Sequence, residues 1–289
     1  MVSKQLTKVP LKIEQIINFQ QYPIADLSQQ KSLDIIANCR QQLESRGCCV
    51  FKNFLTPQAL FLAQQESFAL ENEAYYATRN TNIFKTDDDP TLPPEHPARF
   101  FMERTNGFVP LNKFHPQSLF LTLYRAKTFQ NLIAACLASE PIYEYSDPLA
   151  GLVLNILRQD AQHPWHYDEN DFSVVLMIQA ASAGGIFEYA PHIRTLSSEN
   201  YELVNQVLHG YYQDVEQNQL QPGDLQIFQG KLSLHRVTKV AGNQKRYTAI
   251  FSYTKENNAM ATAKYSEALF GKAISPTARQ TKILVDKEM

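Results

Sequence analysis

The feature that most constrains the fold is a series of short strands in the second half of the chain. Five apolar, β-branched or aromatic segments, GLVLNIL, SVVLMIQ, GIFEYA, DLQIF and RYTAIFSY, lie between residues 151 and 253. Glycine-containing turns at 183–185, 222–224 and 241–243 separate several of them. Short strands at this spacing are typical of a sandwich or a barrel, so this half predicts a β core.

The first half predicts helices that pack on the outside of this core. Residues 28–46 place apolar side chains at helical spacing and end at Gly47, which suits a left-handed C-terminal position. CCVFKNFL follows as a strand, and Thr56 and Pro57 supply an N-cap and a first-turn proline for a helix over residues 57–73. Further helices are expected over residues 117–138, over 197–209 and in the tail after 254. The expected class is therefore α+β.

One long segment lacks periodicity. Residues 78–118 are rich in proline and charge, and they exceed the usual length of a connection in a compact domain. A lid over a functional site and a surface excursion without a role both fit this composition.

Composition excludes several classes of function. The 27 lysines and arginines nearly balance the 29 aspartates and glutamates, which removes the basic surface expected of a nucleic-acid binder. No continuous apolar run resembles a signal peptide or reaches membrane-spanning length. The four cysteines lack both zinc-type spacing and the density of a disulfide scaffold. We expect a cytoplasmic protein that acts on a small molecule, without a nucleic-acid or membrane partner.

A stretch rich in ligand chemistry, 163-HPWHYDENDF-172, precedes one of the strands. Residues two apart in an extended segment point the same way, so His166 and Asp168 can meet at one point. His235, in KLSLHRVT, offers a third ligand. Two histidines and one carboxylate form the facial triad that suits non-heme Fe(II). A His-x-Asp pair often arises by chance, so a polar loop with unrelated acids remains the alternative.

The spacing after His235 strengthens the iron hypothesis. Arg246 and Thr248 follow beyond one turn and share one face of the returning strand. The planar arginine fork suits the distal carboxylate of a dicarboxylic cosubstrate such as 2-oxoglutarate. An ordinary surface arginine is the alternative. A zinc site built on His163 and His166 would leave Arg246 and Thr248 unexplained.

With these residues in place, the chain resembles the iron(II)/2-oxoglutarate-dependent oxygenases, in particular the branch of free-amino-acid, lysine-type hydroxylases and radical halogenases. The resemblance rests on WHYDENDFSVVLMIQ, GGIFEYAPHIR, PGDLQIFQGKLSLHRVT and KRYTAIFSY, within residues 150–255. It implies a single domain over residues 1–289. A helical part to about residue 140 would precede a distorted double-stranded β-helix, a cupin-like jelly roll, over about 150–255, and a helical tail would follow.

The resemblance also implies the chemistry. In halogenases of this branch a glycine replaces the carboxylate of the motif, whereas this chain keeps Asp168, so the implied reaction is hydroxylation with dioxygen. His166, Asp168 and His235 would be the catalytic iron ligands. Arg246 and Thr248 would bind 2-oxoglutarate. Asn155 could join them, or it could hydrogen-bond to its own backbone.

Four further residues are candidates for binding the substrate. His163 and Glu169 flank the motif, and Arg104 and Asp147 are carried over on looser similarity. The alternatives are a solvated loop acid for Glu169 and surface ion pairs for Arg104 and Asp147. The implied substrate is a free polar or basic amino acid such as lysine. The rival function is a cupin-like metal-binding or sensing protein without turnover, and the sequence leaves open whether the chain forms a homodimer.

Overall fold

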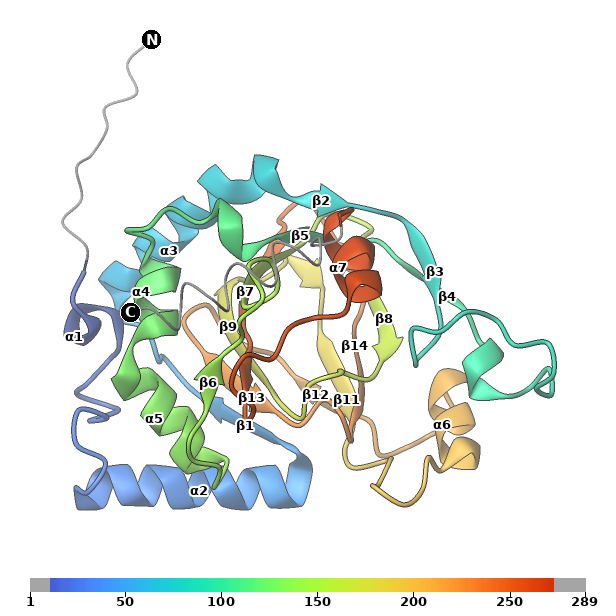
Figure 1. Ribbon diagram of the computed structural model, residues 1–289, viewed down its shortest axis with the longest axis horizontal. Coiled ribbons are helices and arrows are strands. Elements are labelled where there is room, and N and C mark those ends of the chain that lie inside the picture. Colours follow the sequence, from blue (N-terminus) through green and yellow to red (C-terminus); the bar gives the residue numbers. More distant parts are fainter. Residues whose placement is uncertain (1–10, 273–289) are drawn as a thin grey trace, which may run out of the picture.

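Two facing antiparallel sheets form the centre of the molecule (Figure 1). The structure is a computed structural model that describes residues 11–272. The major sheet has the strand order β1 (Cys48–Phe51), β13 (Leu225–Phe228), β9 (Ser173–Gln179), β16 (Arg246–Phe251), β7 (Leu152–Leu157), β5 (Gly107–Val109) and β2 (Tyr75–Tyr76). The minor sheet has the order β12 (Glu216–Asn218), β11 (Phe187–Ala190), β14 (Leu234–Val237) and β8 (His163–His166).

The chain passes repeatedly from one sheet to the other. Along the sequence β7 lies in the major sheet, β8 in the minor, β9 in the major, β11 in the minor, β13 in the major, β14 in the minor and β16 in the major. This alternation is the topology of a double-stranded β-helix. Phe187 and Tyr189 of the minor sheet pack against Phe228 of the major sheet and fill the space between the two sheets.

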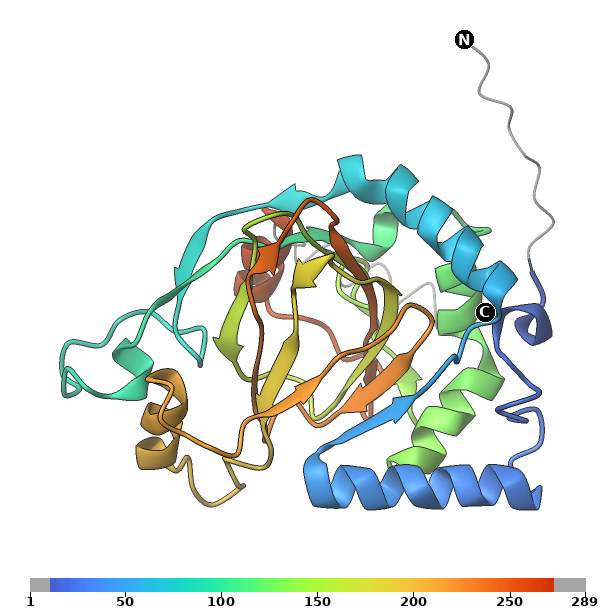
Figure 2. The ribbon, with the colours of Figure 1, turned by 180° about the vertical axis from the view of Figure 1, so that it is seen from behind.

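Helices cover the outer face of the major sheet, as Figures 1 and 2 show from opposite sides. They are α1 (Ile13–Ile16), α2 (Gln30–Arg46), α3 (Pro57–Leu70), α4 (Leu119–Arg125) and α5 (Lys127–Cys136). Their apolar side chains form one buried cluster with outward-facing residues of the sheet such as Leu154 and Leu176. The predicted caps are present: Thr56 accepts a hydrogen bond from Ala59 N–H, and Gly47 is left-handed with φ 67°. The helical first half also contributes β1, β2 and β5 to the sheet.

The helix predicted over residues 117–138 is divided in two. Ala126 is extended, with ψ 117°, and separates α4 from α5. The Gln130 side-chain amide donates to the Tyr124 carbonyl at 3.1 Å, which satisfies an acceptor near the end of α4. No glycine or proline lies at this break, so the sequence pattern predicted one continuous helix across it.

The long segment 78–118 has secondary structure of its own. It contains the hairpin of β3 (Arg79–Thr81) and β4 (Met102–Arg104), the short helices η2 (Pro97–Arg99) and η3 (Leu111–Lys113), and β5. Its outermost part packs against α6 (Tyr201–Leu208), where the Asn205 amide donates to the Glu95 carbonyl at 3.0 Å. These two insertions project together from one side of the molecule (Figure 1).

Small elements complete the described chain: η1 (Glu71–Glu73), β6 (Tyr143–Glu144), β10 (Ala183–Gly184), β15 (Val240–Ala241), β17 (Tyr253–Thr254) and α7 (Ala263–Phe270). Helix α7 falls within the predicted helical tail, and the rest of that tail, residues 273–289, lies outside the described residues.

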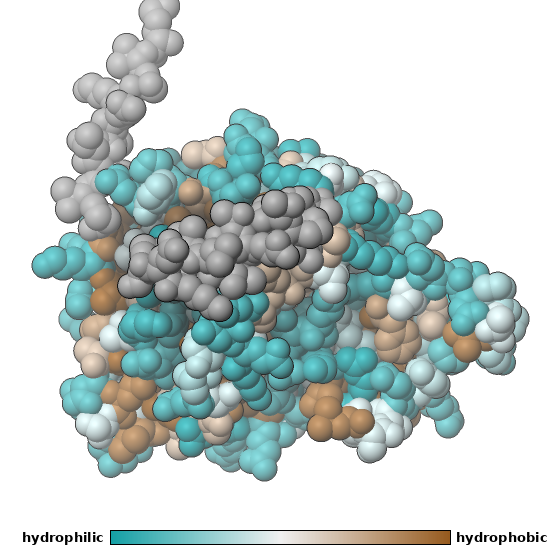
Figure 3. All heavy atoms as spheres, in the orientation of Figure 1, coloured by the Kyte–Doolittle hydropathy of each residue, from teal (hydrophilic) through white to brown (hydrophobic). Residues whose placement is uncertain are grey.

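Within residues 11–272 no helix combines the length and the apolarity needed to cross a membrane. Hydrophobic residues form separate small patches on the face shown in Figure 3.

Candidate active site

Three side chains with metal-ligand chemistry converge at one end of the minor sheet. His166 closes β8 and pairs directly with His235 on β14, and Asp168 follows β8 by two residues. The Asp168 Oδ1 atom lies 3.7 Å from His166 Nε2 and 3.5 Å from His235 Nε2. One ligand atom from each residue lies within 4.8 Å of the other two. The strand pairing thus assembles the predicted triad on one side of a single point.

Backbone carbonyls set the orientation of both imidazoles. His166 Nδ1 lies 2.8 Å from the Pro164 carbonyl, and His235 Nδ1 lies 3.0 Å from the Ser233 carbonyl. A carbonyl only accepts, so each Nδ1 carries a proton, and Nε2 is the ring nitrogen that faces the triad centre. Burial, reinforced by the neighbouring His163 and His235, lowers the pKa of His166 well below its ordinary value. The ring is therefore neutral, as metal ligation requires.

The carboxylate of Asp168 is held in place by its surroundings. Ser173 Oγ donates a hydrogen bond to Oδ2 at 2.5 Å, and the backbone N–H of Asp168 donates to the Gly230 carbonyl at 3.0 Å. Burial alone would raise the pKa of Asp168, but His235, Lys85 and the Ser173 hydroxyl together hold it well below its usual range. Gly230 packs so closely on this side chain that an added Cβ would lie 2.7 Å from Asp168 Cγ. The site is shaped around an ionised carboxylate.

A buried guanidinium lies at the start of β16, in the facing major sheet. Arg246 is only 3% exposed, its Nε has no hydrogen-bond partner among the described residues, and its contact with Thr248 Oγ1 is a long 3.4 Å. Burial lowers its pKa to about 10, so it remains charged at neutral pH. An unpaired buried charge costs several kcal/mol, roughly 3–5 in comparable cases, so this guanidinium requires an anion as its partner. This arrangement fits a carboxylate of 2-oxoglutarate.

Asn155 lies next to Thr248 in the major sheet. Its position on β7 is directly opposite Thr248 on β16, and its Oδ1 accepts a hydrogen bond from Asn106 Nδ2 at 2.9 Å. Asn106 Oδ1 in turn lacks a partner within the described part of the chain. The two amides thus form a buried polar pair beside Thr248. The alternative bond from Asn155 to its own backbone is not the contact that the structure shows.

Two of the predicted substrate residues lie close to the triad. The His163 ring stacks on His166 with centroids 3.8 Å apart, and burial lowers the pKa of His163 well below its ordinary value. Arg104, on β4, is 8% exposed and lies 5.7 Å from the ring of Phe108, which is itself 6.3 Å from the ring of His163. One Arg104 nitrogen donates to the Ala268 carbonyl, whereas Nε lacks a partner among the described residues.

The other two predicted substrate residues, Glu169 and Asp147, differ in burial and in hydrogen bonding. Glu169 is exposed beside Asp168 and takes part in no hydrogen bond or ion pair with the rest of residues 11–272. Asp147 is fully buried, and its carboxylate accepts backbone N–H bonds from Leu149, Ala150 and Ala261. These bonds explain the burial of Asp147 without a ligand, so its role in substrate binding stays a prediction. The surface ion pairs considered for Arg104 and Asp147 are wrong, because both side chains are buried.

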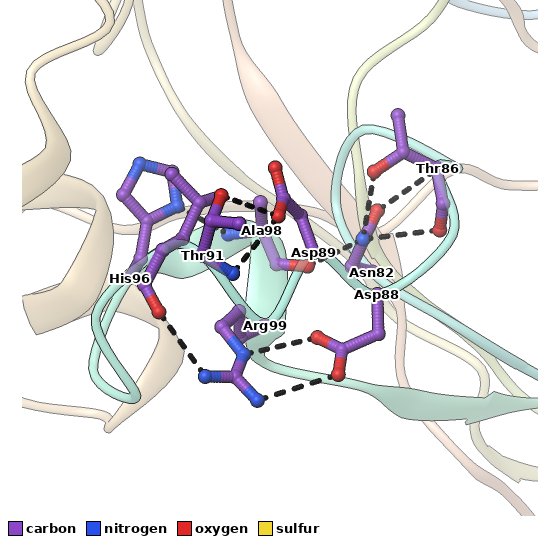
Figure 4. Close-up of polar contacts among 9 residues, drawn as sticks. Asn82, Thr86, Asp88, Asp89, Thr91, His96, Ala98 and Arg99 are labelled. Carbon is purple, nitrogen blue, oxygen red and sulfur yellow. Dashed lines mark hydrogen bonds and ion pairs between the residues drawn. The ribbon is translucent and has the colours of Figure 1, made fainter.

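The sequence interpretation missed Lys85, Ser173 and Gly230. Lys85 belongs to a loop that Asn82 and Arg99 brace through a network of polar contacts (Figure 4). Its positive charge acts on Asp168, Glu169 and Arg104. No motif distinguishes these three residues, because each acquires its role through contacts with distant parts of the chain.

Comparisons with known proteins agree with this geometry. The family model described as Halogenase D matches residues 31–270. No curated protein shows significant sequence similarity. A 2OG-Fe(II) oxygenase family protein from Burkholderia pseudomallei is 14% identical, with a TM-score of 0.51 over 78% of this chain and 92% of that chain.

Two further solved structures resemble the chain to a similar degree. AviO1 from Streptomyces viridochromogenes Tue57 is 15% identical, with a TM-score of 0.53 over 77% of this chain and 96% of that chain. The non-heme alpha ketoglutarate dependent carbocyclase SnoK is 10% identical, with a TM-score of 0.55 over 82% of this chain and 92% of that chain. At these identities the likeness shows the fold, and the predicted α+β jelly roll is confirmed.

Proposed function

This chain belongs to the Halogenase D family, and from that premise we propose that it hydroxylates an unactivated carbon of a small free amino acid. The family, the jelly-roll fold and the His166, Asp168 and His235 triad together make it an Fe(II)/2-oxoglutarate-dependent oxygenase. The predicted enzyme class and cofactors are thereby confirmed. The narrower assignment to lysine-type hydroxylases is not.

The observation that carries hydroxylation is the carboxylate of Asp168. The resemblance described above places glycine at this position in radical halogenases, where it leaves room for chloride on the metal. Here Asp168 fills that room, and Ser173 and Gly230 hold the carboxylate against the two histidines. These three protein ligands would leave room on a bound Fe(II) for 2-oxoglutarate and dioxygen. This arrangement favours transfer of oxygen rather than of a halide.

The residues of the chain fit both cofactors. Bound iron with 2-oxoglutarate would supply the oxidation of an unreactive C–H bond. His166 and His235 direct their Nε2 atoms toward Asp168, and Arg246 with Thr248 offers the partner that the distal carboxylate of 2-oxoglutarate needs. The rings of Phe228 and Phe187 lie 4.8 and 5.8 Å from the ring of His235, where they would shield that side of a bound metal from water.

The choice of a free amino acid is supported by the charged groups around the triad. Glu169 is available for an ammonium group, and Arg104 has an unsatisfied Nε for a carboxylate. A basic substrate such as lysine remains the prediction from sequence resemblance. A cytoplasmic location also remains a proposal, which the four free, buried cysteines support.

A substrate screen tests the proposal. The protein is supplied with Fe(II), 2-oxoglutarate and dioxygen, and each proteinogenic amino acid is assayed for succinate formation and for a mass gain of one oxygen. Chloride is included in a parallel series, and a chlorinated product would contradict hydroxylation. Turnover restricted to a peptide or a carrier-bound residue would contradict the free amino acid. Iron binding without succinate from any substrate would favour the rival cupin-like sensing protein.

A further inference from the structure

A braced loop presents Lys85 next to the iron triad. Asn82 is fully buried, and its Oδ1 accepts the backbone N–H groups of Phe84 and Thr86, both at 3.1 Å. The Asn82 amide donates to Thr86 and to the Ala98 carbonyl, which closes the loop (Figure 4). Lys85 itself is left-handed, with φ 58°. Such a backbone is unfavourable for a residue with a side chain and persists where the surroundings impose it, often at functional sites.

The loop is attached directly to the segment that carries Asp168. The backbone N–H of Tyr167 donates to the Ile83 carbonyl at 3.1 Å, and the Phe84 ring stacks on the Tyr167 ring with centroids 6.0 Å apart. On the other side, the Lys85 ammonium lies 5.9 Å from the ring of Tyr265 in α7. Lys85 is therefore held between the metal segment and α7.

Lys85 and Arg104 form a pair of cations without an acid that bonds to either. Within residues 11–272, the Lys85 ammonium has no hydrogen bond or ion pair, and Arg104 bonds only to a backbone carbonyl. Burial lowers the pKa of each group, and the charges of Asp168, Glu169 and Arg104 act on Lys85. Two desolvated cations in one place need an anion that the described residues do not supply.

The charges around the loaded metal show what kind of molecule fits. With both cofactors bound, the charges of Fe(II) and the Arg246 guanidinium would balance those of Asp168 and the two carboxylates of 2-oxoglutarate. The groups left for the substrate are the cations Lys85 and Arg104 and the exposed acid Glu169. Their sum is one positive charge, which matches an amino acid that carries one ammonium and two carboxylates.

We infer that the substrate is an amino acid with an acidic side chain, whose two carboxylates are bound by Lys85 and Arg104 while Glu169 faces its ammonium group. This inference rests on the proposed function and narrows its substrate class. It departs from the basic amino acid expected from sequence resemblance, because a lysine substrate would add a further positive charge to a site that already has one in excess.

Binding of matched acid and amide pairs tests the inference. The anaerobic protein with Fe(II) and 2-oxoglutarate is titrated calorimetrically with glutamate, glutamine, aspartate, asparagine and lysine, and the same compounds are assayed for oxygen insertion. The wild type should bind one of the acids at least about tenfold more tightly than its amide, as expected when a buried cation loses its partner. Lysine should bind weakly.

Variants of Lys85 then test whether this residue causes the preference for an acid over its amide. Lys85→Met should abolish the preference for acid over amide, and Lys85→Arg should restore part of it. Lys264→Met is the matched control, because Lys264 precedes Tyr265 on α7, but its side chain is 67% exposed and pairs with Asp87. Both methionine variants should bind iron and 2-oxoglutarate like the wild type, which shows that they fold.

Failure of this inference can be distinguished from failure of the proposed function. Preferential binding of lysine or of a neutral amino acid, or an unchanged acid preference in Lys85→Met, would overturn the inference and leave the hydroxylation of an amino acid standing. Binding and oxidation of no amino acid at all would overturn the proposed function and this inference with it.

Discussion

Replacing Gly230 by alanine should disable the metal site without altering any ligand. Gly230 precedes β14 and lies against the side chain of Asp168. An added Cβ would lie 2.7 Å from Asp168 Cγ and 2.9 Å from Asp168 Cβ, and nearer still to Oδ2. The atoms crowded here belong to a short side chain that Ser173 already fixes, so they cannot swing away as the end of a long side chain would.

The size of the effect follows from these distances. Ordinary van der Waals contact begins at 3.4 Å, so the Asp168 carboxyl carbon must move by about 0.7 Å or more. Metal–ligand bonds tolerate deviations of only about 0.2 Å. Gly230→Ala should therefore remove the carboxylate from the metal. By analogy with the loss of orienting contacts, iron affinity should fall on the order of 100-fold, or about 2.7 kcal/mol.

Anaerobic titration with Fe(II) measures this loss, and thermal unfolding of the metal-free protein separates it from misfolding. Asp168→Gly provides the decisive background, because it removes the side chain that the new methyl group would displace. Gly230→Ala should lower iron affinity in the wild type and have little further effect on Asp168→Gly. Equal losses in both backgrounds, or wild-type iron affinity in the single variant, would refute the steric argument.

The remaining predictions concern the triad, the cosubstrate and the substrate. Replacing His166, Asp168 or His235 by alanine should sharply weaken iron binding and abolish succinate formation, and any variant with wild-type activity would exclude that residue as a ligand. Arg246→Ala should raise the Michaelis constant for 2-oxoglutarate by the equivalent of roughly 2–5 kcal/mol, and an unchanged constant would place the cosubstrate elsewhere. Glu169→Gln should weaken amino-acid binding in calorimetry far more than binding of iron or 2-oxoglutarate, whereas equal binding by both proteins would identify Glu169 as a solvated loop acid.

The β core could be predicted because its determinants are local. The segments that became β7, β9 and β16 are short, β-branched and bounded by turns, and each needs no distant information to read as a strand. The division between α4 and α5 could not be predicted in this way. Ala126 favours a helix, and the Gln130 contact that accompanies the break depends on tertiary packing.

The same distinction between local determinants and tertiary packing applies to the candidate site. His166, Asp168, His235 and Arg246 lie on strands or next to them, so their spacing along the sequence indicates which side chains meet. Gly230 acquires its importance only where it packs against Asp168. The sequence could therefore predict the chemistry of the metal but not the packing that holds its carboxylate.

The residues that hold the metal and the cosubstrate lie in a different part of the fold from Lys85, and the two parts differ in how easily they can change. The two histidine ligands and Arg246 belong to the paired strands of the jelly roll, where a shift of one residue would reverse every side chain, and Asp168 directly follows one of these strands. Lys85 belongs instead to a loop whose shape depends on Asn82 and on one backbone bond to Tyr167. Substitutions in that loop can alter the charge offered to a substrate while the metal and the cosubstrate keep their partners. Substrate preference in this fold should therefore vary more readily than the oxidative chemistry, and the sequence of the strands alone indicates only the latter.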